Sequence, residues 1–195
     1  MIINFFDLYD CKQIDKEYLP LLSEFSVRKD GGNLANYICN VSGTYSQALL
    51  DEENHTARTY LIIDKKTSEI AGYFALKAGN VAVNVKRRLL AKEFDSLPGV
   101  ELANFAVNDA YIKRHKNRKG LGAAIFEYCI IPKAKEAQDI IGIKFIYIFA
   151  LPHADLIKRY EKYGFARLSG LQEKNTHKLI RPRYDGGCIF MYQTL

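Results

Sequence analysis

The segment Asn117-Arg118-Lys119-Gly120-Leu121-Gly122 joins basic side chains to two glycines. The apolar run before it, residues 100–107, predicts a strand, and the apolar spacing after it, in residues 123–129, predicts a helix. Glycine lets the backbone approach an anion closely, and the first N–H groups of a helix have no intrahelical partner. The segment is therefore predicted to be a phosphate-binding loop at the start of a helix.

The positive charge of the chain is gathered in three places. The 195 residues carry a net charge of +6, with an isoelectric point near 9.0. The clusters are residues 86–88, residues 112–119, and the C-terminal group Lys174, Lys178, Arg181 and Arg183. Such clusters suit an anionic ligand, either a phosphorylated cofactor or a nucleic acid. The alternative is a solvated surface that only keeps the protein soluble.

The remaining composition is that of a soluble globular protein, and we expect a single domain over residues 1–195. No apolar run approaches the ~20 residues needed to cross a bilayer, and the N-terminus lacks the pattern of a signal peptide. The cysteines Cys11, Cys39, Cys129 and Cys188 are far apart in sequence, which predicts reduced thiols and a cytoplasmic location. The histidines are equally scattered, so no metal site is expected.

The elements that must position this loop follow from hydrophobic spacing. The predicted strands are residues 2–8, 59–63, 70–76, 100–107, 143–149, 165–168 and 188–192. The predicted helices are residues 14–25, 34–50, 85–94, a helix from about 119 that Pro132 kinks or ends, and 153–163. Strand, helix and strand around the loop form a right-handed crossover, so these two strands should be parallel. The fold class is α/β with a mixed sheet.

Three segments in order make the chain resemble the GNAT (GCN5-related N-acetyltransferase) superfamily. They are the strand Glu101-Leu102-Ala103-Asn104-Phe105-Ala106-Val107, the loop 117–122, which resembles the family's Arg/Gln-x-x-Gly-x-Gly/Ala motif, and residues 156–165, which are similar to its Tyr-x-x-x-Gly-Phe block. The resemblance implies a mostly antiparallel sheet with a central parallel strand pair splayed apart and helices on both faces.

The resemblance also implies the cofactor and the residues that bind it. The co-substrate is acetyl-CoA, with no metal. The cofactor-binding residues implied are Phe105, Ala106, Val107, Asn117, Arg118, Lys119, Gly120, Leu121, Gly122, Ala123 and His153. Asn117 replaces the usual Arg or Gln, and His153 replaces a common Asn. The basic segment between Val107 and Asn117 is longer than in most members of the family, so Lys113, Arg114 or Lys116 could contact the 3′-phosphate.

Two catalytic residues are implied by position. Tyr160 matches the tyrosine whose hydroxyl points at the thioester sulfur, so it is the predicted general acid; the alternative is a packed aromatic, since Leu156 and Tyr163 share its helical face. Glu101 matches the base glutamate of some histone-type members, and the alternative is a solvent-facing strand residue paired with a lysine.

The predicted function is acetyl transfer from acetyl-CoA to a primary amine by direct attack in a ternary complex. The expected acceptor is a small-molecule or protein amine. No association with a membrane is expected. The alternatives are an aminoacyl-tRNA acetyltransferase of the toxin type, with tRNA as partner, and a non-catalytic domain that senses acyl-CoA or binds nucleic acid. A homodimer is left open by the sequence.

Overall fold

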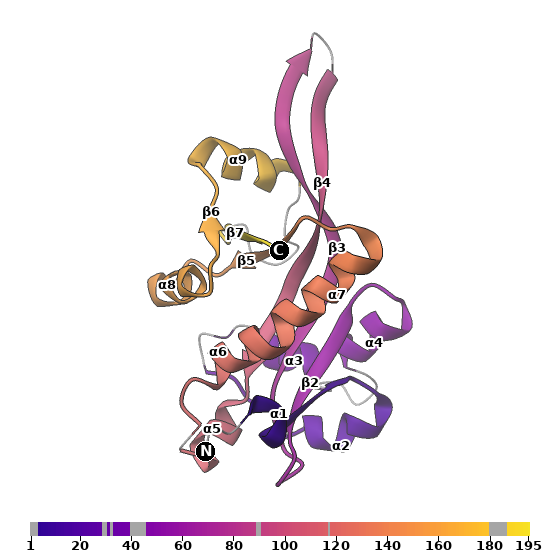
Figure 1. The fold of residues 1–195 in the computed structure, drawn as a ribbon, viewed down its shortest axis with the longest axis vertical. Helices are drawn as coiled ribbons and strands as arrows, with labels where there is room; N and C mark the ends of the chain where they lie inside the picture. Colours follow the sequence, from indigo (N-terminus) through magenta and orange to yellow (C-terminus); the bar gives the residue numbers. More distant parts are fainter. Residues whose placement is uncertain are drawn as a thin grey trace. The chain divides into compact units, whose positions relative to one another are not determined.

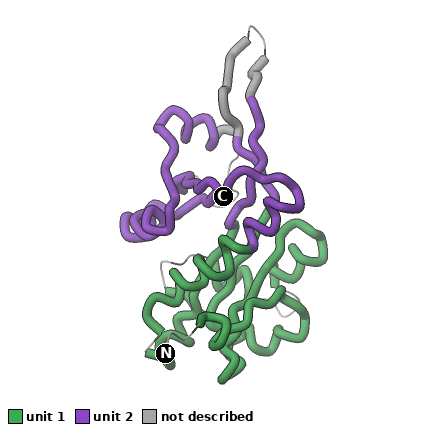
Figure 2. The backbone as a smooth tube through the Cα atoms, in the orientation of Figure 1, with its two compact units in different colours: residues 1–77, 103–132 green, residues 78–102, 133–195 purple. Residues whose placement is uncertain are grey.

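The structure is a computed structural model that describes residues 4–28, 31, 33–39, 46–88, 91–116, 118–179 and 187–195. The chain divides into two compact units, shown in Figure 2. Unit 1 comprises Met1–Lys77 and Ala103–Pro132, and unit 2 comprises Ala78–Leu102 and Lys133–Leu195. No helix within these described ranges is both long and apolar enough to cross a membrane.

The strands form one mixed sheet in the order β1-β2-β3-β4-β5-β7-β6. Their bounds are β1 Tyr9–Gln13, β2 Arg58–Asp64, β3 Ile70–Arg88, β4 Ala91–Val107, β5 Phe145–Ala150, β6 Ala166–Arg167 and β7 Ile189–Thr194, and β2 to β7 are labelled in Figure 1. Antiparallel pairing joins β1 to β2, β2 to β3, β5 to β7 and β6 to β7, whereas β4 and β5 are parallel. The predicted mixed, mostly antiparallel sheet with a parallel pair is confirmed.

The parallel ladder between β4 and β5 is short. Gly99, Val100 and Glu101 lie opposite Phe145, Ile146 and Tyr147, and the recorded pairing ends there. Both strands continue, β4 to Val107 and β5 to Ala150. Beyond Tyr147, β5 is therefore paired through β7 alone among the recorded ladders.

The helices are short apart from those that follow the loop. Their bounds are α1 Phe5–Leu8, α2 Leu19–Leu22, α3 Leu34–Ile38, α4 Gln47–Glu53, α5 Asp109–Arg114, α6 Leu121–Ile125, α7 Ile131–Ile141, α8 Ala154–Lys162 and α9 Gly170–Leu179. A π-helical turn, Phe126–Ile130, joins α6 to α7. Helical structure thus passes through Pro132 instead of ending there. Proline cannot donate to the preceding turn, and a local π turn is a common accommodation.

Each unit has its own core. In unit 1, apolar side chains from the N-terminal helices pack on β2 and β3, with Leu22, Ile38, Leu61 and Tyr73 among the most buried. In unit 2, the core is aromatic: Phe145, Tyr147 and Phe190 are almost fully buried around Val81. Alternate residues of β5 therefore line this aromatic face, because successive strand side chains point to opposite faces.

Three predicted elements are wrong. The helix expected over residues 85–94 is instead the end of β3 and the start of β4. Val81, Val83 and Val85 are β-branched at alternate positions, which favours a strand. The strand expected over residues 2–8 gives way to α1, where Asn4 and Asp7 form a capping box.

The single helix predicted over residues 34–50 is also wrong. The described part contains α3, which ends at Ile38, and α4, which begins at Gln47. The Ser46 side chain accepts a hydrogen bond from the N–H of Leu49 and so starts a new helix. Residues 40–45 lie outside the described part of the chain.

Candidate functional site

The glycine loop ends where Gly120 caps α6. Gly120 has φ 84°, in the left-handed region that favours glycine, and a Cβ at this position would meet no atom within 4 Å. Leu121 and Ile125 are buried and anchor the helix. No side chain caps the helix start. The Leu121 and Ala123 N–H groups donate to the carbonyls of Arg118 and Gly120, whereas the Gly122 N–H donates to no carbonyl among the described residues and can meet solvent or an anion.

Arg118 is tied to a buried carboxylate beneath the loop. Its guanidinium lies 3.8 Å from Asp64 Oδ2 and 5.5 Å from the centre of the Tyr9 ring. Asp64 is 2% exposed and accepts hydrogen bonds from the Tyr111 hydroxyl and from the backbone of Lys66. Burial alone would raise the pKa of Asp64, but these hydrogen bonds and Arg118 hold it below its ordinary value. The loop is thus fixed to the turn between β2 and β3.

The basic residues before the loop fall into paired and unpaired groups. Lys113 lies 2.8 Å from Asp109, while Arg114 and His115 both contact Glu69. Lys116 and Lys119 are exposed and form no ion pair with any residue that the structure describes. Much of the predicted positive cluster is therefore neutralised within unit 1, and these two lysines keep their charge available.

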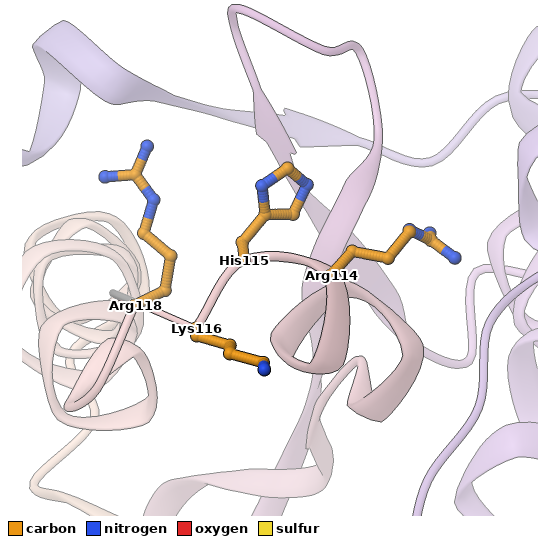
Figure 3. Close-up of a pocket in the computed structure, with 4 residues that line it drawn as sticks. All are labelled: Arg114, His115, Lys116 and Arg118. Atoms are coloured by element: carbon orange, nitrogen blue, oxygen red, sulfur yellow. The ribbon is translucent and has the colours of Figure 1, made fainter.

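A pocket of about 500 Å³ lies over this segment, lined by Arg114, His115, Lys116 and Arg118. Figure 3 shows that Arg118 and His115 project to the same side of the loop, whereas Lys116 and Arg114 point elsewhere. The His115 ring packs 4.4 Å from that of Tyr111, measured between ring centres. Three of the four lining side chains take part in the ion pairs with Glu69 and Asp64, so Lys116 is the lining residue whose charge would be available to a phosphate group.

The end of β4 is held by a buried asparagine. Asn108 is 3% exposed; its side chain donates to the carbonyl of Ile70 and accepts from the N–H groups of Ser26 and Ala110. These bonds fix the chain where β4 turns into α5, just after Phe105, Ala106 and Val107. Buried polar groups are stable only when paired in this way.

Gly72 brings α6 close to the same strand end. A Cβ at Gly72 would lie 2.9 Å from the carbonyl oxygen of Ala106 and 3.0 Å from Ile125 Cδ1. The absent side chain therefore lets β3, the end of β4 and the loop helix pack together. Within unit 1, the predicted residues 105–107 and 118–123 thus belong to one packed assembly.

Tyr160 lies on α8 in unit 2. It is 5% exposed, and its ring makes edge contacts with Tyr163 and Phe165 at 6.1 and 5.6 Å between ring centres. Burial raises its pKa well above the ordinary value for tyrosine, so the hydroxyl is protonated at neutral pH. Gly164, with φ 91°, ends the helix as predicted, and the Phe165 N–H donates to the Tyr160 carbonyl.

Glu101 and His153 occupy different settings in unit 2. The Glu101 carboxylate accepts a hydrogen bond from the hydroxyl of Tyr147, its partner across the β4–β5 ladder. His153 is exposed at the start of α8, and its carbonyl accepts from the N–H groups of Leu156 and Ile157. Its side chain makes no capping bond.

The predicted residues are divided between the units. Unit 1 holds Phe105, Ala106, Val107 and residues 118–123, and unit 2 holds Glu101, His153 and Tyr160. Asn117 lies outside the described residues. Among the described side chains, no three of the types His, Cys, Asp and Glu group so as to hold a metal ion.

Sequence reasoning missed the residues that support the site. Asp64 and Tyr111 lie 47 positions apart in the sequence, and only the fold brings them into contact. Glu173 and His177 are four residues apart on α9, a spacing that places them on one helical face.

Comparison with solved structures gives the fold. No protein-family model matches the chain. A tyrosine-to-phenylalanine mutant of the toxin AtaT aligns with a TM-score of 0.64 at 14% identity, over 96% of this chain and 90% of that one. A tyrosine-to-phenylalanine mutant of KacT gives 0.66 at 12%, over 96% and 95%. AtaT complexed with acetyl-methionyl-tRNAfMet gives 0.62 at 15%, over 93% of each chain.

AtaT and KacT have the GNAT fold, and a further AtaT structure in the comparison contains acetyl-CoA. The similarity covers nearly the whole of both chains. The GNAT fold indicated by three short motifs is therefore confirmed, and at these identities the likeness concerns the fold alone.

Proposed function

We propose that the protein is an acetyl-CoA-dependent N-acetyltransferase. The observation that carries this proposal is the uncapped start of α6 at Gly120, packed against the end of β4 and flanked by unpaired lysines. A helix start beside a strand end, with cations nearby, is the arrangement by which a GNAT fold would bind a pyrophosphate. The likeness to AtaT bound to acetyl-CoA supports the same ligand.

The coenzyme would be bound mainly by backbone groups. Within residues 118–123, the N–H groups of Lys119, Gly120 and Gly122 donate to no described backbone carbonyl and would hold the pyrophosphate, with Asn117 contributing from the same loop. The backbone of Phe105, Ala106 and Val107 would pair with the amide-rich pantetheine arm as an added strand. Lys116 and Lys119 would supply cations for the phosphates, and His153 would contact the arm from the start of α8.

Acetyl transfer requires a proton donor for the departing thiolate. In the proposed mechanism the amine attacks the thioester carbonyl, the C–S bond breaks, and the Tyr160 hydroxyl protonates the sulfur. Burial favours this role because it keeps the phenol protonated. A backbone N–H of β4 would stabilise the developing oxyanion, a contribution on the order of 3 kcal/mol.

The base role predicted for Glu101 stays a proposal. A carboxylate at this position would remove the proton from the attacking amine directly or through water. Its hydrogen bond with Tyr147 gives it a structural role as well, since it links the two strands of the parallel ladder.

An aminoacyl-tRNA is the second candidate acceptor, beside the small-molecule or protein amine expected from the sequence. The observation favouring it is the likeness to AtaT complexed with acetyl-methionyl-tRNAfMet. The exposed lysines beside the loop would contribute to binding a polyanion. Affinity for tRNA should then fall steeply with salt, whereas a neutral acceptor would show no such slope.

The test is acetyl transfer to a set of acceptors under one condition. Purified protein would be mixed with acetyl-CoA and with methionyl-tRNA, spermidine, free lysine or a lysine-containing peptide, and the acetylated product identified by mass spectrometry. We expect transfer to at least one of these acceptors. Measurable binding of acetyl-CoA without transfer to any of them would favour an acyl-CoA sensor and contradict the proposal.

A further inference from the structure

Helix α9 carries an imidazole and a carboxylate one turn apart. His177 Nε2 lies 3.8 Å from Glu173 Oε1, and the His177 ring meets the Phe149 ring edge-on with 5.9 Å between ring centres. The His177 side chain is 21% exposed, so it is supported by the protein yet reachable. At 3.8 Å the carboxylate is within ion-pair distance of Nε2 but beyond hydrogen-bond distance, and Nδ1 has no carboxylate within ion-pair distance among the described residues.

Glu173 is itself held in place by the sheet. Its Oε1 accepts a hydrogen bond of 3.1 Å from the N–H of Phe190, and its Oε2 lies 3.6 Å from Arg167. In the recorded ladder, β6 pairs with β7 at Tyr192 and Met191. Phe190 is the next residue of β7, and its N–H donates to Glu173 instead of to β6. The carboxylate therefore has a structural reason to stay beside His177.

The position of His177 along β5 connects it to the proposed chemistry. Its contact, Phe149, lies two residues beyond Tyr147, the last residue of β5 in the recorded ladder with β4. Phe149 also shares the face of Tyr147, because alternate residues of a strand point the same way. His177 thus lies beside the stretch of β5 beyond its recorded ladder with β4, which is where the proposed function would place the thioester.

Glu101 is less suited to accept the proton. Its carboxylate already accepts the hydroxyl of Tyr147, which is 2% exposed and whose pKa is raised by burial and by the Glu101 charge. A proton on Glu101 would weaken this buried bond. We propose that His177 is the general base of the acetyl transfer, that Glu173 is its positioning residue, and that Glu101 holds the strand ladder; this inference rests on the proposed function.

The proton balance of the step is complete. As the amine nitrogen forms its bond to the carbonyl carbon, Nδ1 of His177 takes the proton that this nitrogen loses. The C–S bond breaks and the thiolate receives its proton from Tyr160. The imidazolium then releases its proton to solvent and the Tyr160 phenolate takes up a proton from solvent, so both side chains return to their starting state and no oxidant or metal is needed.

The test is affinity labelling with bromoacetyl-CoA, which does not depend on knowing the acceptor. A ring nitrogen near the acyl group displaces bromide: a C–N bond forms, the C–Br bond breaks, and the proton goes to solvent. We expect the label on the tryptic peptide of residues 175–178, with labelling blocked by excess coenzyme A and absent in His177→Gln.

The outcomes separate this inference from the proposed function. Binding of the reagent without labelling of the 175–178 peptide would overturn the role of His177 and leave the acetyltransferase proposal standing. Failure of the protein to bind the reagent or acetyl-CoA would overturn both.

Kinetics supply the second readout. We expect His177→Ala to lose at least about 100-fold in acetyl transfer, with acetyl-CoA affinity unchanged, and to regain activity with added imidazole. His55→Gln, in an exposed turn of unit 1, is the matched control and should keep full activity. A loss that imidazole does not restore, in a variant that still folds, would contradict the base assignment.

Discussion

The two units stabilise their functional groups in opposite ways. In unit 1, Arg114 and Arg118 are held by ion pairs with Glu69 and Asp64. In unit 2, Tyr160 is held by aromatic rings and by a glycine-capped helix end. The loop of unit 1 is thus positioned by charge, whereas Tyr160, the proposed proton donor, is positioned by packing.

This difference teaches what each unit contributes. Ion pairs around the loop neutralise most of its positive charge, so in the proposed function the coenzyme would be bound by backbone N–H groups and by the unpaired lysines. Aromatic packing keeps a phenol protonated, which suits a proton donor. Changes in unit 1 should therefore alter binding and acid stability, and changes in unit 2 should alter turnover.

The largest expected effect is in unit 2. Tyr160→Phe keeps the packed ring and removes the hydroxyl, so turnover should fall about 10²–10⁴-fold while acetyl-CoA affinity is retained. Steady-state kinetics and calorimetry would measure both quantities. Tyr163→Phe, on the same helix and in contact with Tyr160, is the control. Equal losses in the two variants would remove the special role of Tyr160.

The second effect is on the stability of unit 1. Asp64→Asn weakens hydrogen bonds to a buried charged acceptor, each worth on the order of 1.5–3 kcal/mol. Because folding lowers the pKa of Asp64, its contribution is present above the ordinary pKa, about 4, and is lost as pH falls through the folded value.

Denaturant unfolding as a function of pH would measure this contribution. The variant should be less stable than the natural chain at neutral pH, and the gap should close on acidification. A gap that is constant from pH 7 to pH 3 would show that Asp64 is not charged in the folded state.

The third effect separates loop geometry from backbone strain. Gly120→Ala places a Cβ on a left-handed residue, at a cost of about 1–2 kcal/mol. Gly142→Ala is the matched control, because Gly142 has φ 66° and equally open surroundings after α7. Both variants should lose similar stability in thermal unfolding, but Gly120→Ala alone should weaken acetyl-CoA binding. Equal affinity in the two variants would mean that the loop does not approach the ligand.

The smallest effect distinguishes the unpaired from the paired cations. Lys116→Ala should weaken acetyl-CoA binding severalfold and reduce its salt dependence, since an exposed ionic contact is worth about 0.2–1 kcal/mol. Lys113→Ala should change binding less, because Lys113 pairs with Asp109. Titrations at two salt concentrations would measure this. A larger effect of Lys113 would place the phosphate nearer α5.

The sequence predicted the parts of the molecule that depend on local pattern. The strands β2 and β5, helix α8 and the glycine that ends it follow from apolar spacing and Gly164. Residues 70–76 and 100–107 were predicted correctly as strands of β3 and β4, but residues 85–94 were predicted as a helix, because a basic segment with mixed spacing satisfies helical and extended patterns alike until its partner strand is known. Pairing across the sheet decides between them.

The same limit applies to the site. Gly120 and Gly122 are visible as a motif, and Tyr160 is visible by its place in a motif. The pairing of Asp64 with Arg118 and of Glu101 with Tyr147 depends on which segments the fold brings together. These long-range contacts determine which cations stay unpaired, and no local pattern encodes them.

The measurement that tests the central claim most directly is the initial rate of thiol release from acetyl-CoA, with and without acceptor, for the natural chain and Tyr160→Phe. If the protein is an acetyltransferase, thiol release should depend on the acceptor and should nearly disappear in Tyr160→Phe. Release at background rate with every acceptor, in a protein that binds acetyl-CoA, would contradict it.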